Sequence, residues 1–86
     1  MYYVYVIQSI AERERFYLGS TTNLKRRIEE HNRGKTQSTK AHQWQLVYYE
    51  AYMNESAARK REHKLKQDGR AKRFLMQRIK DSLKTN

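Results

Sequence analysis

One acidic residue falls on what the sequence predicts to be a buried helix face. The segment "ESAARKREHKLK", residues 55–66, has a helical composition, and its only likely core contacts are Ala58 and Leu65. Glu62 lies between them, at i+4 from one and i−3 from the other, so it shares their face. Because an unpaired buried carboxylate is costly, Glu62 needs a cation, a metal ion or water beside it.

Two readings of Glu62 stay open on spacing alone. In the first, its carboxylate holds a divalent metal ion, since hard cations prefer oxygen ligands. In the second, it forms a structural salt bridge with an arginine such as Arg27 or Arg61.

A second group of candidate residues lies on an earlier basic helix, "NLKRRIEEH", residues 23–31. Leu24 and Ile28 form its apolar stripe, and Arg27 and His31, four residues apart, form the adjoining row. Arg27 therefore sits at the margin of the buried face. It is either a site residue or part of a solvated basic surface.

Tyrosines form the third group, because the chain has seven tyrosines and only two phenylalanines. Tyr3 and Tyr5 alternate onto one face of a predicted strand, and Tyr17 and Gly19 do so on the next. Aromatic residues in a hairpin are normally core residues, but a buried phenol needs a polar partner. We therefore expect some of these hydroxyl groups to border a wet cleft.

These residues depend on a predicted order of strand, strand, helix, strand, helix, helix. The apolar and aromatic runs predict strands at about 2–9, 15–20 and 44–53, with Gly19 ending the second strand. Helices are predicted from Leu24 to near Gly34, over 55–66 with Asn54 as its cap, and over 70–83. The order favours an α/β protein of the α+β type, a three-stranded antiparallel sheet flanked by helices in one domain, residues 1–86.

The amino-acid composition limits the classes of partner and ligand that the protein could bind. The 86 residues carry a formal net charge of +10, which favours a polyanion such as nucleic acid. There is no cysteine for a disulfide or a zinc thiolate site, and the three histidines are scattered. The apolar start is too short to span a membrane and lacks the basic region of a signal peptide, so we expect a cytoplasmic protein with no membrane partner.

Taken together, the residues resemble the GIY-YIG nucleases, which are named for two short motifs on adjacent strands. "YVY", residues 3–5, is similar to the first motif, although Tyr3 stands where that motif usually has glycine, and "YLG", residues 17–19, is similar to the second. The resemblance covers nearly the whole chain. It is closest to small stand-alone bacterial members, which share the "HNRGK", "LVYYE" and "ARKREHKLK" segments.

The resemblance implies metal-dependent hydrolysis of phosphodiester bonds. Glu62 corresponds to the family's metal-binding glutamate and would hold one Mg²⁺ or Mn²⁺, while Arg27 would stabilise charge on the phosphoryl oxygens. Tyr5 or Tyr17 would orient or deprotonate the attacking water, and His31 would contact substrate or relay a proton. Further substrate contacts are expected from Gly19, Asn23, Lys35 and Lys40.

The implied substrate is nucleic acid, DNA rather than RNA, recognised by its structure or its backbone and not by its base sequence. Two other functions stay open. One is a noncatalytic nucleic-acid-binding domain that retains an idle GIY-YIG cleft. The other is a basic structural domain that contacts a ribosome or a partner protein, in which Glu62 would be only a salt-bridged acid.

Overall fold

A three-stranded antiparallel sheet forms the centre of the protein, in a computed structural model that describes residues 1–34 and 42–84. The strand order is β2-β1-β3, with β1 (Tyr2–Ser9) between β2 (Phe16–Thr21) and β3 (Trp44–Tyr52). This arrangement confirms the predicted sheet. The strands β1 and β2 form the predicted hairpin, and β3 pairs with the other side of β1.

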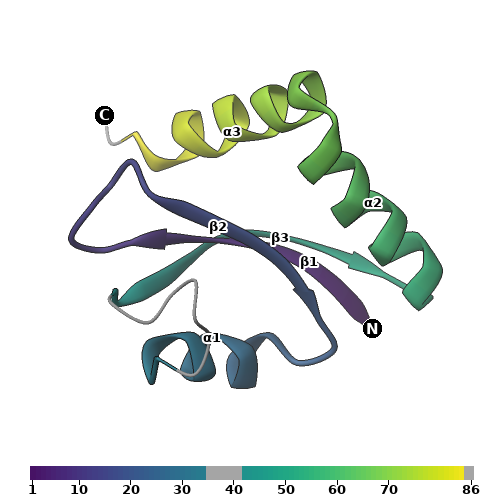
Figure 1. Ribbon diagram of the computed structural model, residues 1–86, viewed down its shortest axis with the longest axis horizontal. Coiled ribbons are helices and arrows are strands. Elements are labelled where there is room, and N and C mark those ends of the chain that lie inside the picture. The colour runs from purple at the N-terminus through teal and green to yellow at the C-terminus, as the bar shows by residue number, and fades with distance from the viewer. Residues whose placement is uncertain (35–41, 85–86) are drawn as a thin grey trace.

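The helices lie on both faces of this sheet (Figure 1). Helix α1 (Leu24–Asn32) covers one face, and α2 (Glu55–Gln67) and α3 (Gly69–Leu83) cover the other. The predicted element order is therefore confirmed. Within the described residues, no helix has both the length and the apolar character needed to cross a membrane.

Alternation along β1 divides its apolar residues between two cores. Val4 and Val6 pack with residues of α2 and α3, whereas Tyr5 and Ile7 pack with Trp44 and with the apolar side of α1. Both faces of β1 are thus covered, which explains why its sequence is an almost unbroken apolar run.

Several predicted boundaries differ from the structure by one or two residues, and two of these differences have a clear physical reason. Gly19 does not end β2, because it pairs with Tyr5 inside the β1–β2 ladder and the strand continues to Thr21. Helix α3 begins one residue before the predicted Arg70, because the carboxylate of Asp68 accepts hydrogen bonds from the first backbone N–H groups of the helix.

Asparagines cap the other two helices, α1 and α2. The predicted cap Asn54 accepts a hydrogen bond from the backbone N–H of Ala57 at 2.8 Å, and Asn23 accepts one from Arg26 at 3.1 Å. Each satisfies an N–H group that a helix start leaves without an intrahelical partner.

A partly buried polar network connects α2 to β3, and sequence analysis did not predict it. Arg61 donates to both carboxylate oxygens of Glu50, at 2.9 and 3.0 Å, and the hydroxyls of Tyr48 and Tyr52 each donate to Glu50 at 2.5 Å. Burial raises the pKa of Glu50, but these hydrogen bonds outweigh burial and the pKa is lowered. Glu50 therefore stays ionised at neutral pH and stabilises the α2–β3 contact.

We expect Glu50→Gln to lower the free energy of unfolding by about 2 kcal/mol, because it leaves the partly buried Arg61 without its counterion. Thermal melts at neutral pH should show a loss of about 10 °C in Tm. Because the folded pKa of Glu50 is lowered, its stabilisation is present above the unfolded pKa and disappears as the pH falls through the folded pKa. The Tm values of wild type and variant should therefore converge in acid.

The matched control is Glu55→Gln, since Glu55 forms an exposed ion pair with Arg59 at 3.6 Å. Its Tm should stay within a few degrees of wild type. Equal losses for the two variants would contradict a special role of the Glu50 network.

Candidate active site

The hydroxyl of Tyr5 is the centre of the site on the α1 side of the sheet. The Tyr5 side chain has no exposed surface, and its oxygen lies 2.7 Å from Nε2 of His31. Arg27 donates from Nε to the same oxygen at 3.3 Å. Because arginine can only donate, the Tyr5 oxygen accepts from Arg27, and the tautomer of the imidazole sets the direction of the hydrogen bond between Tyr5 and His31.

The pKa shifts indicate which of these three groups carry a charge. Burial raises the pKa of Tyr5 to about 12, although the hydrogen bond and charge of Arg27 act in the opposite direction. Burial and then the charge of Arg27 lower the pKa of His31. The hydrogen bond to Tyr5 raises the pKa of Arg27. At neutral pH, a charged guanidinium is therefore held beside a neutral phenol and a neutral imidazole.

Gly19 makes room for these rings. It lies opposite Tyr5 in the β1–β2 register. A Cβ atom at this position would lie 2.6 Å from the Tyr5 hydroxyl oxygen and 3.2 Å from Cε1 of Tyr17. Among the described residues only Gly34 has a positive φ, of 73°, so Gly19 is required for close approach and not for a special backbone conformation.

Tyr17 completes the group on this face. Its ring centroid lies 4.9 Å from that of His31, in an edge-to-face arrangement. Tyr17 is half-buried, in contrast to Tyr5 and His31, which have no exposed surface. The structure thus brings together four of the predicted residues: Tyr5, Tyr17, Arg27 and His31.

A pocket of about 340 Å³ opens beside this group. Arg27 borders it with one third of its side chain exposed, and its Nη1 also pairs with Glu30 at 3.1 Å. The lining runs from the end of β2 into the first turns of α1: Ser20, Thr21, Thr22, Asn23, Arg26, Arg27 and Glu30. A group bound here would face the guanidinium of Arg27.

Glu62 approaches from the other face of the sheet. Its Oε1 accepts a hydrogen bond at 2.7 Å from Oγ of Ser20 on the edge strand β2, and its Oε2 accepts one at 2.9 Å from Lys66. Ser20 follows Gly19 and also lines the Arg27 pocket. Glu62 therefore lies on the opposite face of the sheet from the other predicted residues, and only the edge strand β2 stands between them.

The partners of Glu62 differ from the predicted salt bridge. Arg27 pairs with Glu30 and Arg61 pairs with Glu50, whereas Glu62 pairs with Lys66. Burial raises the pKa of Glu62, but the hydrogen bonds from Lys66 and Ser20 outweigh burial and the pKa is lowered. The carboxylate is therefore ionised at neutral pH.

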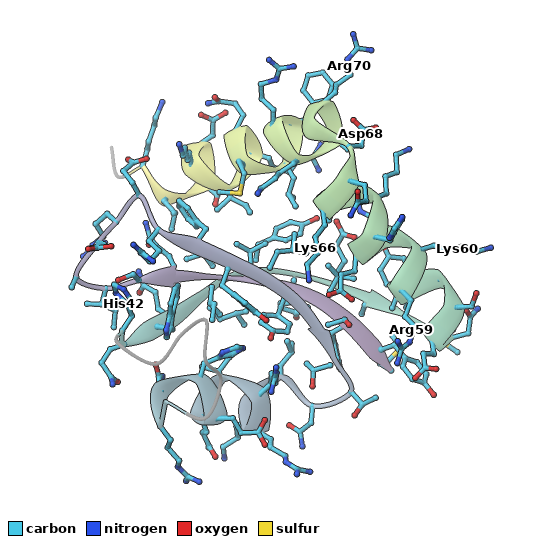
Figure 2. All side chains as sticks on the ribbon, viewed as in Figure 1. His42, Arg59, Lys60, Lys66, Asp68 and Arg70 are labelled. Carbon is cyan, nitrogen blue, oxygen red and sulfur yellow. The ribbon has the colours of Figure 1, made fainter. Side chains whose placement is uncertain are left out.

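Glu62 is the predicted metal ligand, and basic side chains surround it. Glu62 borders an open pocket of about 740 Å³ along α2, and Figure 2 labels Arg59, Lys60 and Lys66 of its lining on that helix. Across residues 1–34 and 42–84, no three acidic, histidine or cysteine side chains gather as metal ligands. One ionised carboxylate beside open space fits Mg²⁺ or Mn²⁺, because waters and a phosphate can complete the shell.

The remaining predicted residues are placed as follows. Asn23 lines the Arg27 pocket while its side chain caps α1. Lys35 and Lys40 lie outside the described residues. Ser20 was missed by sequence analysis, and its position directly after the second motif is the signal that could have indicated it.

Comparison with known proteins shows a family match and several relatives. The GIY-YIG catalytic domain family matches residues 1–76. A UPF0213 protein of Natronomonas pharaonis is 42% identical over 74 residues, covering 84% of this chain and 85% of its own. A UPF0213 protein of Haloquadratum walsbyi is 38% identical (84% and 81% covered), and one of Lactiplantibacillus plantarum is 36% identical (81% and 71% covered).

No solved structure matches the chain. The family match extends from the first strand into α3, so it contains both motifs, the helix with Arg27 and the helix with Glu62. This protein belongs to the GIY-YIG catalytic domain family, whose members are nucleases.

Proposed function

We propose that this protein is a divalent-metal-dependent endonuclease that hydrolyses phosphodiester bonds in nucleic acid. The observation that carries the proposal is the position of Ser20, which holds the carboxylate of Glu62 and also borders the pocket of Arg27. The guanidinium of Arg27 and the carboxylate of Glu62 therefore lie on either side of the same edge strand. Phosphoryl transfer needs both, one for the phosphoryl oxygens and one for a metal ion.

The guanidinium of Arg27 is oriented before substrate binds. Nε donates to Tyr5 and Nη1 to Glu30, which leaves the other N–H groups free to meet a phosphoryl oxygen in the pocket. Such fixed donors stabilise the charge that develops in the transition state.

Glu62 would hold the metal ion, and the hydroxyl of Ser20 fixes the direction of its carboxylate. A Mg²⁺ or Mn²⁺ ion bound there would supply Lewis-acid polarisation of the scissile phosphate. Lys66 is half-exposed on a long side chain, so its ammonium can leave the carboxylate when another cation binds.

The two tyrosines divide the remaining roles. Tyr5 keeps its proton because burial raises its pKa to about 12, so it positions Arg27 and does not act as a base. His31 has no exposed surface and positions Tyr5. The half-buried Tyr17 is then the residue that orients or deprotonates the attacking water.

We further propose that the substrate is DNA rather than RNA, held chiefly by its phosphates in keeping with the net charge of +10, and that the protein is cytoplasmic. Lys35 and Lys40 remain predicted phosphate contacts. The second candidate function is a noncatalytic nucleic-acid binder. The observation that favours it is the ion pair in which Lys66 occupies Oε2 of Glu62.

Glu62→Gln should reduce metal-dependent cleavage by at least a hundredfold, because it removes the charge that holds the metal ion. Its partner Lys66 is half-exposed, so the variant should keep its Tm within a few degrees. Cleavage of labelled DNA and RNA with Mg²⁺, Mn²⁺ or EDTA and a thermal melt on one preparation measure both.

Glu55→Gln is the matched control, since Glu55 lines the same pocket of α2, and it should cleave like wild type. Full cleavage by a folded Glu62→Gln protein, with contaminating nuclease excluded, would remove Glu62 from the mechanism.

The division between the tyrosines predicts different losses. Tyr17→Phe should lower kcat by about a hundredfold or more without loss of stability, because it removes only the group that handles water. Tyr5→Phe should lower both activity and Tm, because it removes the buried hydrogen bond between the phenol oxygen and Nε2 of His31. If Tyr17→Phe keeps full activity and loses as much Tm as Tyr5→Phe, a group other than Tyr17 orients or deprotonates the attacking water.

Gly19→Ala should disturb the site through Tyr5, since the new Cβ would meet the Tyr5 hydroxyl. Overpacking of this kind costs about 1–3 kcal/mol, and the displaced phenol would no longer orient Arg27, so cleavage should fall at least tenfold. Gly69→Ala is the control, because a Cβ there meets nothing within 4 Å. Wild-type cleavage and Tm in Gly19→Ala would contradict the close packing of this strand on Tyr5.

A further inference from the structure

Part of the sheet face that carries Tyr5 is not covered by α1. Residues directly opposite in an antiparallel pair point to the same face, and β1 and β3 pair Tyr5 with Tyr49 and Tyr3 with Ala51. Tyr3, Tyr49 and Ala51 therefore lie on the face of Tyr5. The apolar side of α1 packs instead over Tyr5, Ile7 and Trp44.

Two aromatic rings occupy this open area. The rings of Tyr3 and Tyr49 pack edge to face, with centroids 5.9 Å apart and planes at 69°. Tyr49 is 54% exposed, and Ala51 beside it is also exposed. Tyr3 braces the Tyr49 ring from the side while one surface of that ring stays accessible.

We propose that the exposed ring of Tyr49 stacks on an unpaired base of the nucleic acid whose phosphate lies at Arg27. This inference rests on the proposed function, because it takes the substrate of that site to be nucleic acid, and it narrows the substrate class to strands with unpaired bases.

Distance supports the link between the two positions. Tyr49 lies directly across from Tyr5, and neighbouring strands are about 5 Å apart. The Tyr5 hydroxyl in turn contacts Arg27. Tyr5 therefore links the two positions, and a strand with one phosphate in the Arg27 pocket could extend over this sheet face toward Tyr49.

An unpaired base is the group that best fits the exposed ring of Tyr49. The faces of bases inside a duplex are already stacked on their neighbours, so only an unpaired base can present a whole face to a protein ring. Every base has such a face, so recognition by Tyr49 would not depend on base sequence. A second copy of this chain fits less well, because two chains of net charge +10 repel each other.

The test measures binding by fluorescence anisotropy, with the whole chain in EDTA so that no cleavage occurs. The probes are a labelled single strand of mixed sequence, a blunt duplex of that sequence, and a strand of abasic nucleotides. Tyr49→Ala should weaken binding of the single strand about tenfold and leave the duplex and the abasic strand unchanged. Tyr49→Phe keeps the ring and should bind like wild type.

Phe74→Ala is the matched control, since Phe74 is an aromatic residue with 67% exposure on α3, across the sheet from Tyr49. It should leave all three affinities unchanged. The proposal is overturned if Tyr49→Ala binds the single strand like wild type, weakens all three probes equally, or acts only by changing the oligomeric state in sedimentation.

The proposed nuclease function fails in a different assay. If wild type and Glu62→Gln show the same absence of metal-dependent cleavage, catalysis is refuted, while the anisotropy result for Tyr49 still decides the stacking proposal.

Discussion

The buried hydroxyl of Tyr5 imposes the constraint on which the site depends. A phenol without exposed surface must be hydrogen-bonded, and both of its partners come from α1. Arg27 and His31 reach it because they are four residues apart and so lie on one side of the helix. The hydrogen bonds that hold α1 against the sheet at Tyr5 therefore also orient the side chain of Arg27. The absence of a side chain at Gly19 then allows β2 to pass close to the Tyr5 ring.

The position of β2 at the edge of the sheet is equally necessary. The helices that carry Arg27 and Glu62 lie on opposite faces of the sheet. If β2 were a central strand, the neighbouring strands on both sides would keep the two side chains apart. At the edge, Ser20 can hold Glu62 and border the Arg27 pocket at once. A long edge strand exposes backbone groups to pairing with other chains, and β2 has only six residues.

Much of this arrangement could be predicted because it is encoded locally. The apolar spacing of Ala58 and Leu65 places Glu62 against the sheet, and Asn54 marks the start of its helix. The second strand was predicted to end at Gly19 but continues to Thr21, because a glycine required for close packing cannot be told from a turn glycine by sequence alone.

Contacts between distant segments could not be predicted. Asn32 uses its side chain to pair with both backbone groups of Trp44, at 3.1 and 2.6 Å, and so attaches the end of α1 to the start of β3. Nothing in the composition of either segment specifies that register. The same is true of Ser20 with Glu62 and of Arg61 with Glu50, each of which depends on how a helix settles on the sheet.

Two carboxylates at α2, Glu50 of β3 and Glu62 of α2 itself, differ in their capacity to bind a further ligand. Both have a lowered pKa, so the shift alone does not distinguish them. Each oxygen of Glu50 accepts from one tyrosine and from Arg61, which fills its capacity. Each oxygen of Glu62 has one such donor, and one of the two is a half-exposed lysine at the rim of an open pocket. Glu62 therefore keeps lone pairs for a further ligand, whereas Glu50 has none to offer.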